Sequence, residues 1–384
     1  MYKIIILVIF ITPVALLAQT NLEFSFGSFG GYENNIFNVP SVWTGEDENS
    51  QLQSGMFVLN DLKLGVNIDT KRHQYALIGR GTHTLFPGID AANLFNGKID
   101  SKYSFSPQSK LKFYLKNHWL TKQRNNTIDE TEEFRTPRSY HHLNGLIGLE
   151  YKINKKLKLS PEFFAARRMY SPTEESSLTY NEIGVTLKAT QRIKLKQKQR
   201  LYLNNKTTFF NRYYLDVTEE FDESFNEEEE EELEEEVFIT ENRRHWQYIS
   251  NTFDLRFKLK NDTRLKWGLQ LEQRNDLSQN RFGYREYESF LEWSKTIEHW
   301  FIKFRASYAN RQFTDLIIDN ANATHLVYNF VRGSMTINYQ LNDKWVIESK
   351  FNASLRNSNN PSTATYSYRE YFNYFTQLGL RLSL

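Results

Sequence analysis

The sequence has no cysteine in its 384 residues. The chain therefore has neither a disulfide framework nor a thiolate metal site, and no lipid-modified cysteine follows its first apolar stretch. No later segment is an apolar run of the roughly 20 residues that a transmembrane helix needs. The negative mean hydropathy also excludes a helical membrane protein.

Recognisable catalytic motifs are also missing. There is no Gly-x-Ser-x-Gly, no His-Glu-x-x-His and no phosphate loop. His141 and His142 lie near Ser139, but no third residue can be assigned to orient them. Lysines are scattered instead of forming a basic patch, so nucleic-acid binding has no support. We predict no enzyme, no cofactor and no metal site.

What the sequence does contain is alternation of apolar and polar residues, most clearly over Thr324 to Leu384. Apolar side chains recur at every second position of three runs there, beginning at Val327, Trp345 and Phe372. Successive side chains of a strand point to opposite faces, so each run has one apolar and one polar face. Aromatic residues make up 15% of the chain and fall mostly within such runs. This pattern is typical of a β-barrel that has lipid outside and water inside.

Sixteen strand-like runs can be placed after Asn21, and their connections alternate between long and tight. Outer-membrane barrels have an even strand number, short periplasmic turns and longer external loops. The sequence therefore predicts an all-β, antiparallel up-and-down transmembrane barrel of about sixteen strands, with fourteen as the alternative. An even number places both ends in the periplasm.

The first residues predict a signal peptide. Lys3 supplies the positive charge, residues 4–17 the apolar stretch, and Ala18 the small residue before cleavage. We thus predict two parts, a signal peptide at 1–18 and a barrel at 19–384. The absence of room for a plug or an extra domain makes the barrel the only expected domain.

Aromatic residues near the ends of the runs predict two belts at the lipid headgroups. One set lies near tight turns: Tyr151, Trp293, Trp300, Tyr339 and Trp345. The other lies near long loops: Phe86, Trp119, Tyr213, Tyr214, Tyr308 and Tyr328.

Two short segments resemble outer-membrane barrels of Gram-negative bacteria. Residues 31–37, Gly-Tyr-Glu-Asn-Asn-Ile-Phe, look like the Gly-Tyr-Asp-x-Asn opening strand of porin-like families. The end is similar to their assembly signal, with Leu380, Leu382 and Leu384 but no terminal aromatic residue. The resemblance implies a porin-like protein of the outer membrane. Its implied partners are outer-membrane lipids and lipopolysaccharide, the barrel-assembly machinery and small solutes; the oligomeric state stays open.

Charged residues on the polar face are the candidate pore-lining set. Neighbouring strands bring them within reach of cross-strand pairing, and charged rings in pores bias which solutes pass. The predicted set is Glu286, Glu288, Glu292, Lys303, Arg305, Arg332, Lys350 and Arg369. The alternative is that a wide lumen simply needs polar side chains.

An acidic block marks the longest external loop, residues 216–244. Thirteen acids lie between Glu219 and Glu236, and subtracting them leaves about +15 on the rest of a chain whose net charge is +2. The block is a candidate cation-binding or gating loop, and its core is Glu227, Glu228, Glu229, Glu230, Glu231, Glu232, Glu234, Glu235 and Glu236. The alternative is a solvated acidic loop.

We therefore predict a passive or weakly selective diffusion pore for small solutes, because a sixteen-stranded barrel is wide enough for an aqueous channel. Two other functions remain open: a non-conducting envelope scaffold or surface-binding barrel, and an outer-membrane rim hydrolase.

Overall fold

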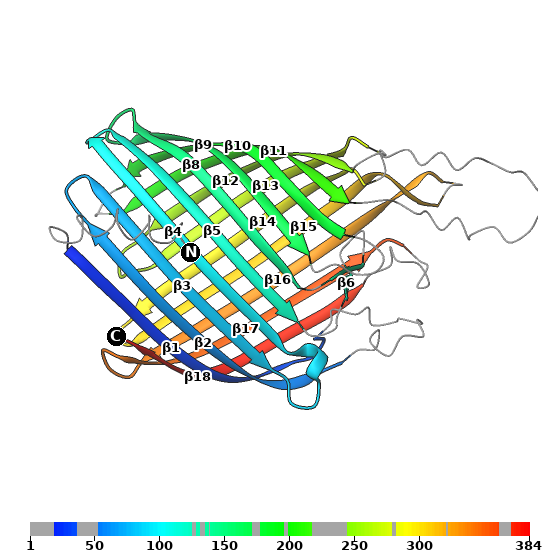
Figure 1. The fold of residues 1–384 in the computed structure, drawn as a ribbon, viewed down its shortest axis with the longest axis horizontal. Coiled ribbons are helices and arrows are strands. Elements are labelled where there is room, and N and C mark those ends of the chain that lie inside the picture. Colours follow the sequence, from blue (N-terminus) through cyan, green and yellow to red (C-terminus); the bar gives the residue numbers. More distant parts are fainter. Residues whose placement is uncertain are drawn as a thin grey trace, which may run out of the picture.

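In the computed structural model, the chain folds into a closed barrel of sixteen antiparallel strands (Figure 1). The structure describes residues 19–36, 53–124, 128–130, 135–137, 139–170, 177–195, 199–216, 244–278, 282–319, 322–360 and 370–384. Within these residues no helix is both long and apolar enough to cross a membrane. The predicted all-β fold and the predicted number of sixteen strands are confirmed, and the alternative of fourteen is wrong.

The barrel strands follow one another around the wall in chain order. They are β1 (Gln19–Glu33), β2 (Gly55–Asp69), β3 (His73–Leu85), β4 (Leu94–Gln108), β5 (Leu111–Arg124), β8 (Tyr140–Lys152), β9 (Leu157–Tyr170), β10 (Ser177–Lys194), β11 (Arg200–Asp216), β12 (His245–Lys258), β13 (Arg264–Asp276), β14 (Tyr284–Ile297), β15 (Trp300–Asp319), β16 (Thr324–Gln340), β17 (Trp345–Ser358) and β18 (Tyr371–Ser383). A short 3-10 helix (Asp90–Ala92) precedes β4, and a two-stranded hairpin, β6 (Ile128–Glu130) with β7 (Arg135–Pro137), lies between β5 and β8.

The two faces of the wall follow the alternation in the sequence. Along β17 the outward side chains include Trp345 and Phe351, at 40% and 43% exposure, whereas Glu348 between them points inward and is 6% exposed. β16 and β18 show the same alternation in register with β17. Apolar side chains exposed on the outside of a closed barrel suit a lipid environment. The assignment of faces from the C-terminal stretch is therefore confirmed.

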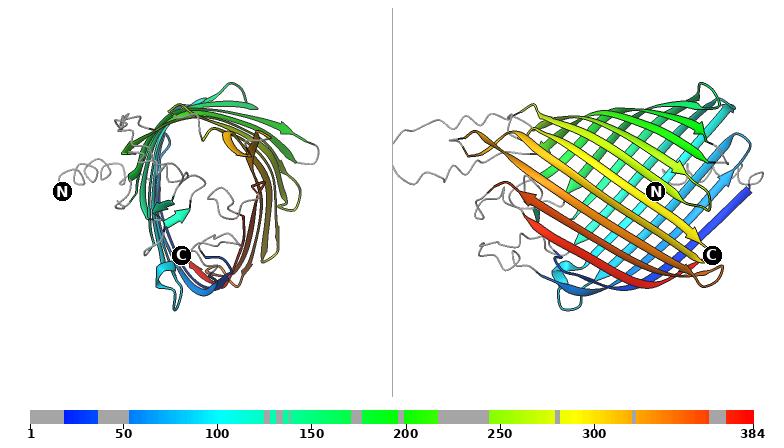
Figure 2. Two further views of the ribbon diagram at one scale, coloured as in Figure 1. Left: turned by 90° about the vertical axis from the view of Figure 1, so that its right-hand side faces the viewer. Right: turned by 180° about the vertical axis from the view of Figure 1, so that it is seen from behind.

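Pairing of β1 with β18 closes the ring (Figure 2). The register runs from Ser25 opposite Ser383 to Glu33 opposite Phe375. Two backbone hydrogen bonds extend it, because Phe24 and Leu384 each donate an N–H to the other's carbonyl at 3.3 and 2.9 Å. No strand edge remains open in the barrel, and closure removes the unpaired backbone groups that lipid does not satisfy.

The strand ends that precede long connections and those that precede short turns lie at opposite ends of the barrel (Figure 1). Two of the short turns use left-handed backbone conformations: Asn261 and Asp262 have φ of 55° and 51°, and Glu298 has φ of 50°. β15 continues to Asp319, because this strand keeps pairing with β16 through two register shifts.

The aromatic residues of the predicted belts face outward at the turn end but only partly at the loop end. Tyr151, Trp300 and Trp345 point outward at the turn end, with exposures of 45%, 46% and 40%. At the loop end Tyr213 and Tyr308 also face outward, at 41% and 50%.

Phe86, Tyr214 and Tyr328 are exceptions, because they are buried inside. Each joins one of three apolar clusters on the inner wall at the loop end, centred on β2–β3, on β10–β12 and on β14–β16. Position near a long loop therefore did not reveal which way these rings point.

Candidate functional site

The inner wall carries charge and the outer wall almost none. Residues of β14 alternate, so that Glu286, Glu288 and Glu292 point inward and Tyr287 and Leu291 point outward at 50% and 40% exposure. Cross-strand register places Lys303, Arg305, Arg332 and Lys350 on the same inner face. All described members of the predicted lumen set therefore line the interior, and their role in solute passage stays a prediction.

Three inward pairs join β14 to β15. Arg311 donates to Glu286 through Nε at 2.8 Å, Lys303 Nζ lies 3.0 Å from Glu292, and Arg305 lies 3.9 Å from Glu288. The first pair is nearly buried, with side-chain exposures of 12% and 9%. The third pair is too long for a hydrogen bond, so N–H groups of the Arg305 guanidinium remain able to donate hydrogen bonds to a solute.

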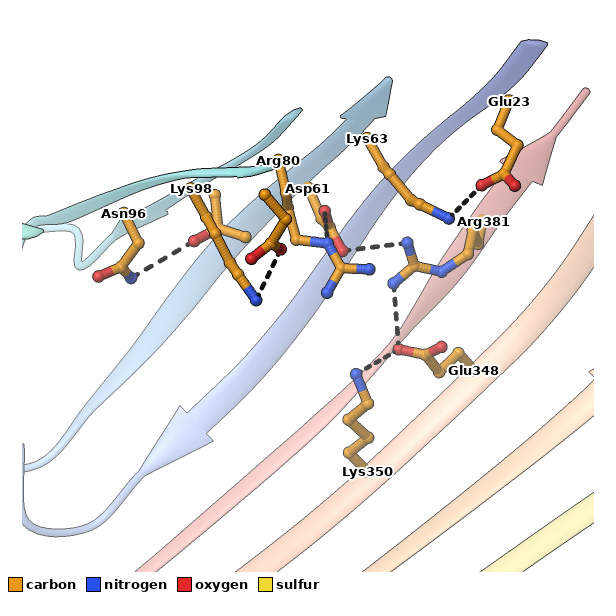
Figure 3. A network of polar contacts seen from close by, with 11 residues as sticks. Glu23, Asp61, Lys63, Arg80, Asn96, Lys98, Glu348, Lys350 and Arg381 are labelled. Atoms are coloured by element: carbon orange, nitrogen blue, oxygen red, sulfur yellow. Dashed lines mark hydrogen bonds and ion pairs between the residues drawn. The ribbon is translucent and has the colours of Figure 1, made fainter. Parts of the chain in front are cut away.

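A second network crosses the closure of the barrel (Figure 3). Arg381 of β18 lies 3.0 Å from Asp61 of β2 and 3.4 Å from Glu348 of β17. Lys350 binds Glu348 at 2.6 Å, and Arg80 lies 3.8 Å from Asp61. Beside it, Lys63 Nζ donates to Glu23 at 2.7 Å. Arg381 therefore links β17, β18 and β2, whereas Lys350 joins the network through Glu348 of its own strand.

Arginines and aromatic rings alternate in a chain of stacked contacts along the inner wall, which we call the arginine–aromatic belt. Guanidinium-to-ring distances range from 4.1 Å for Arg274 and Trp246 to 5.8 Å for Arg212 and Trp246. In order, its members are Tyr140, Arg168, Tyr180, Arg212, Trp246, Arg274, Tyr284, Arg311, Phe330 and Arg332.

Consecutive strands from β8 to β15 each contribute one member of the belt, rings from the even-numbered strands and arginines from the odd-numbered ones. Stacking on a ring face fixes a guanidinium without neutralising its charge. Glu182 and Glu286 pair with Arg212 and Arg311. No carboxylate among the described residues pairs with Arg168 or Arg332. Arg168 and Arg332 are thus fixed positive charges of the belt, whereas the charges of Arg212 and Arg311 are compensated by their carboxylates.

A polar pocket of about 410 Å³ lies against the wall formed by β14–β18. Its charged groups are Glu288, Arg305 and Arg332. Hydroxyl and amide groups complete the lining together with one ring: Ser307, Ser334, Ser354, Asn352, Asn373 and Phe375. Such a mixture of donors, acceptors and one apolar surface suits a small polar solute.

The two adjacent histidines do not form a site together. His141 stacks on Trp119 on the outer face, at 6.4 Å between ring centroids, whereas His142 points inward with its ring 6.2 Å from that of His118. His118 in turn lies 2.7 Å from Asp100. Across the described residues, no group of three or more His, Cys, Asp or Glu side chains could hold a metal ion.

Three predicted features lie outside the described residues. They are the signal peptide at 1–18, Arg369, and the acidic block with Glu227–Glu232 and Glu234–Glu236. The arginine–aromatic belt was missed by sequence reasoning. The alternation in the sequence shows that these aromatic residues lie on the inward face. Their stacking on arginines depends on the cross-strand register, which the sequence alone does not give.

Comparisons with known proteins support the fold. No family model and no curated protein matches the chain. Among solved structures, OccAB1 of Acinetobacter baumannii is similar at 7% identity and a TM-score of 0.50, covering 95% of this chain and 96% of that one. The outer membrane protein OprD of Pseudomonas aeruginosa has 9% identity and a TM-score of 0.47, covering 95% and 94%.

CdiB from Acinetobacter baumannii has 10% identity and a TM-score of 0.45, and the match covers 94% of this chain but only 60% of CdiB. At these identities the likeness concerns the fold alone. The closed barrel and the likeness to OccAB1 agree with the porin-like barrel fold that the sequence predicted.

Proposed function

We propose that the protein is an outer-membrane pore through which small polar solutes diffuse, with a preference for anions. The observation that carries the proposal is the arginine–aromatic belt, a row of fixed guanidinium groups on the inside of a closed barrel. Fixed charges of one sign raise the local concentration of counter-ions and lower the barrier to their entry. The excess of about +15 outside the acidic block supports the same sign.

The polar pocket supports a passage in which solutes pause. Arg305 and Arg332 lie in it with a single carboxylate, that of Glu288. A small anion would exchange its water for guanidinium, hydroxyl and amide donors there. Binding of this kind has to stay weak for solutes to leave again.

Orientation is part of the proposal. The short turns and the ends Gln19 and Leu384 would face the periplasm, and the long connections the outside. A cleaved signal at 1–18 fits that arrangement. Antibody access to a tag inserted at residue 175 in intact cells, with a tag after residue 343 as the inaccessible control, tests it.

Planar-bilayer recording of the purified protein tests the pore. Stepwise conductance is expected, with a reversal potential in a salt gradient that indicates anion preference. A barrel that is folded yet silent would contradict the pore and favour the envelope scaffold or surface-binding barrel. Assaying the same sample for hydrolysis of phospholipid or lipopolysaccharide tests the rim-hydrolase alternative, for which we expect no activity.

We also propose that the acidic block gates the entrance to the lumen at the loop end. Deleting residues 225–236 removes nine glutamates and is expected to increase anion preference and abolish any response to calcium. Replacing the same segment with a Gly/Ser sequence of equal length is the matched control for loop length, because it removes the charge alone. Unchanged conductance and unchanged calcium response in both variants would leave the block as solvated surface.

A further inference from the structure

The outer wall has a groove where its side chains become small. The register defines a row of outward residues running across β4, β5, β8 and β9, namely Ser101, Asn117, Gly145 and Ala165. The neighbouring outward row toward the turn end carries large side chains: Tyr103, Leu115, Ile147 and Phe163. The row toward the loop end is also bulky, with Ile99, Trp119, Leu143 and Arg167. A trench therefore crosses the lipid-facing surface between two ridges.

The trench has the dimensions of a ligand site. Its volume is about 740 Å³, and its walls include Trp119, Leu143, Ile183 and Tyr213. Ligand sites commonly measure about 300–1,000 Å³ and combine apolar walls with a few placed polar groups. Here Asn117, Arg167 and Asn181 supply the polar groups. Asn117 is partly engaged, because it donates to Ser101 at 3.3 Å.

Arg167 is unusual on this surface. At outward positions of the regular ladders, the described strands carry only three charges, on Arg167, Arg285 and Lys295, and all three are positive. Arg285 and Lys295 lie near the ends of β14 (Tyr284–Ile297). Arg167 is exposed between Leu143 and Asn181 and makes no ion pair or hydrogen bond with another described residue. A charge facing lipid is costly unless a partner neutralises it.

We propose that this groove binds an anionic phospholipid of the surrounding membrane. The phosphate would accept hydrogen bonds from the Arg167 guanidinium, with Asn181 beside it, and an acyl chain would lie along Gly145 and Ala165 against Trp119. The guanidinium fork matches phosphate oxygens and pairs with them in bidentate fashion. The small side chains of the trench leave room for methylene groups that the ridges would otherwise exclude.

Charge complementarity favours a lipid over a second copy of the chain. In the described strands the outward positions of the regular ladders hold no carboxylate, so the same face of another copy offers Arg167 no opposite charge. An anionic headgroup supplies that charge wherever the barrel stands in its membrane. The proposal concerns the outside of the wall and does not depend on conduction through the lumen.

Native mass spectrometry of the full-length protein tests the site. Delipidated protein is mixed with phosphatidylglycerol or with phosphatidylcholine of identical chains, and the retained lipid is counted. We expect preferential retention of phosphatidylglycerol, and Arg167→Gln should weaken it about tenfold, the effect of losing one charge-assisted contact. Arg285→Gln is the matched control, an outward arginine away from the groove, and should retain lipid as the unaltered chain does.

A second variant tests the trench itself. A Cβ added at Gly145 would lie 3.5 Å from Asn117 Oδ1, an ordinary contact, so Gly145→Leu fills the groove without disturbing the backbone. It should reduce retention of both lipids, while a heat-dependent gel shift verifies that the barrel is folded. Equal retention of the two lipids, equal losses in the two arginine variants, or a dimer that forms through this face would each overturn the proposal.

Discussion

Arg381 on β18 and Asp61 on β2 form an ion pair of 3.0 Å although β1 lies between their strands. The residue of β1 that is paired with both of them is Gly27. Gly27 has no side chain to separate the two, and the Phe29 ring lies over it, 2.6 Å from where a Cβ would be. The Arg381 guanidinium rests 5.3 Å from that ring. Closure of the barrel is therefore held by side chains as well as by backbone pairing.

Breaking this pair should destabilise the barrel. Arg381 and Asp61 are only 16% and 9% exposed, so Arg381→Gln or Asp61→Asn leaves a poorly solvated charge and should cost about 1–3 kcal/mol. The double variant should cost less than the sum of the two. The midpoint of the heat-dependent gel shift measures this, and strictly additive losses would show that the pair does not couple.

Removing the charges of the polar pocket should reduce anion preference. Arg305→Gln and Arg332→Gln each remove a cation from the pocket, and together they should lower the ratio of anion to cation permeability by about twofold or more. Reversal potentials in a salt gradient measure the ratio. Arg285→Gln, on the outer face, should leave it unchanged. An unaltered ratio in the double variant would remove Arg305 and Arg332 from the selectivity mechanism.

Tyr284 should control the order of the arginine–aromatic belt. Its ring lies 4.3 Å from the Arg274 guanidinium and 4.2 Å from that of Arg311, and its hydroxyl donates to Glu272 at 2.8 Å. Tyr284→Ala removes one stacking partner from each arginine and should increase current noise and lower anion preference. Tyr284→Phe keeps the stacking and loses only the hydrogen bond, worth about 1 kcal/mol. Equally low current noise in both variants would mean that stacking on Tyr284 does not hold Arg274 and Arg311 in place.

Glu162 should matter for stability and not for selectivity. Its carboxylate is 3% exposed and accepts from Lys188 at 2.6 Å and from Tyr114 at 2.7 Å. Glu162→Ala leaves both donors without this acceptor and should cost about 3 kcal/mol. Tyr114→Phe removes one hydrogen bond and should cost about 1 kcal/mol. Urea titration in lipid vesicles, followed by tryptophan fluorescence, measures both; equal small losses would argue against a shared network.

The architecture was readable from the sequence because it depends on local rules. Period-two alternation fixes which residues face lipid, and the alternation of tight and long connections fixes the strand number. Both patterns are clearest where apolar and polar side chains alternate most strictly, as in β16–β18. The end of β15 at Asp319 could not be read from the sequence, because the pairing of residues 317–319 with β16 depends on two register shifts.

The site was only partly readable, because it depends on register. Glu286, Arg305 and Arg332 were recognised as inward residues from their strand parity alone. That Arg274 stacks between Trp246 and Tyr284 depends on the relative shift of β12, β13 and β14, which no local pattern encodes. The groove of Gly145 and Ala165 was hidden for the same reason, since its small residues come from different strands.

The hydrogen bonds between Phe24 and Leu384 make the sheet a ring in which every strand has two neighbours. In such a ring the gap between Leu384 and the start of β1 at Gln19 is one interruption among several at the same rim. A circularly permuted chain, joined there by a short linker and reopened at Asp343, would keep all its ladders. We therefore expect the same barrel to form wherever at this rim the chain begins and ends.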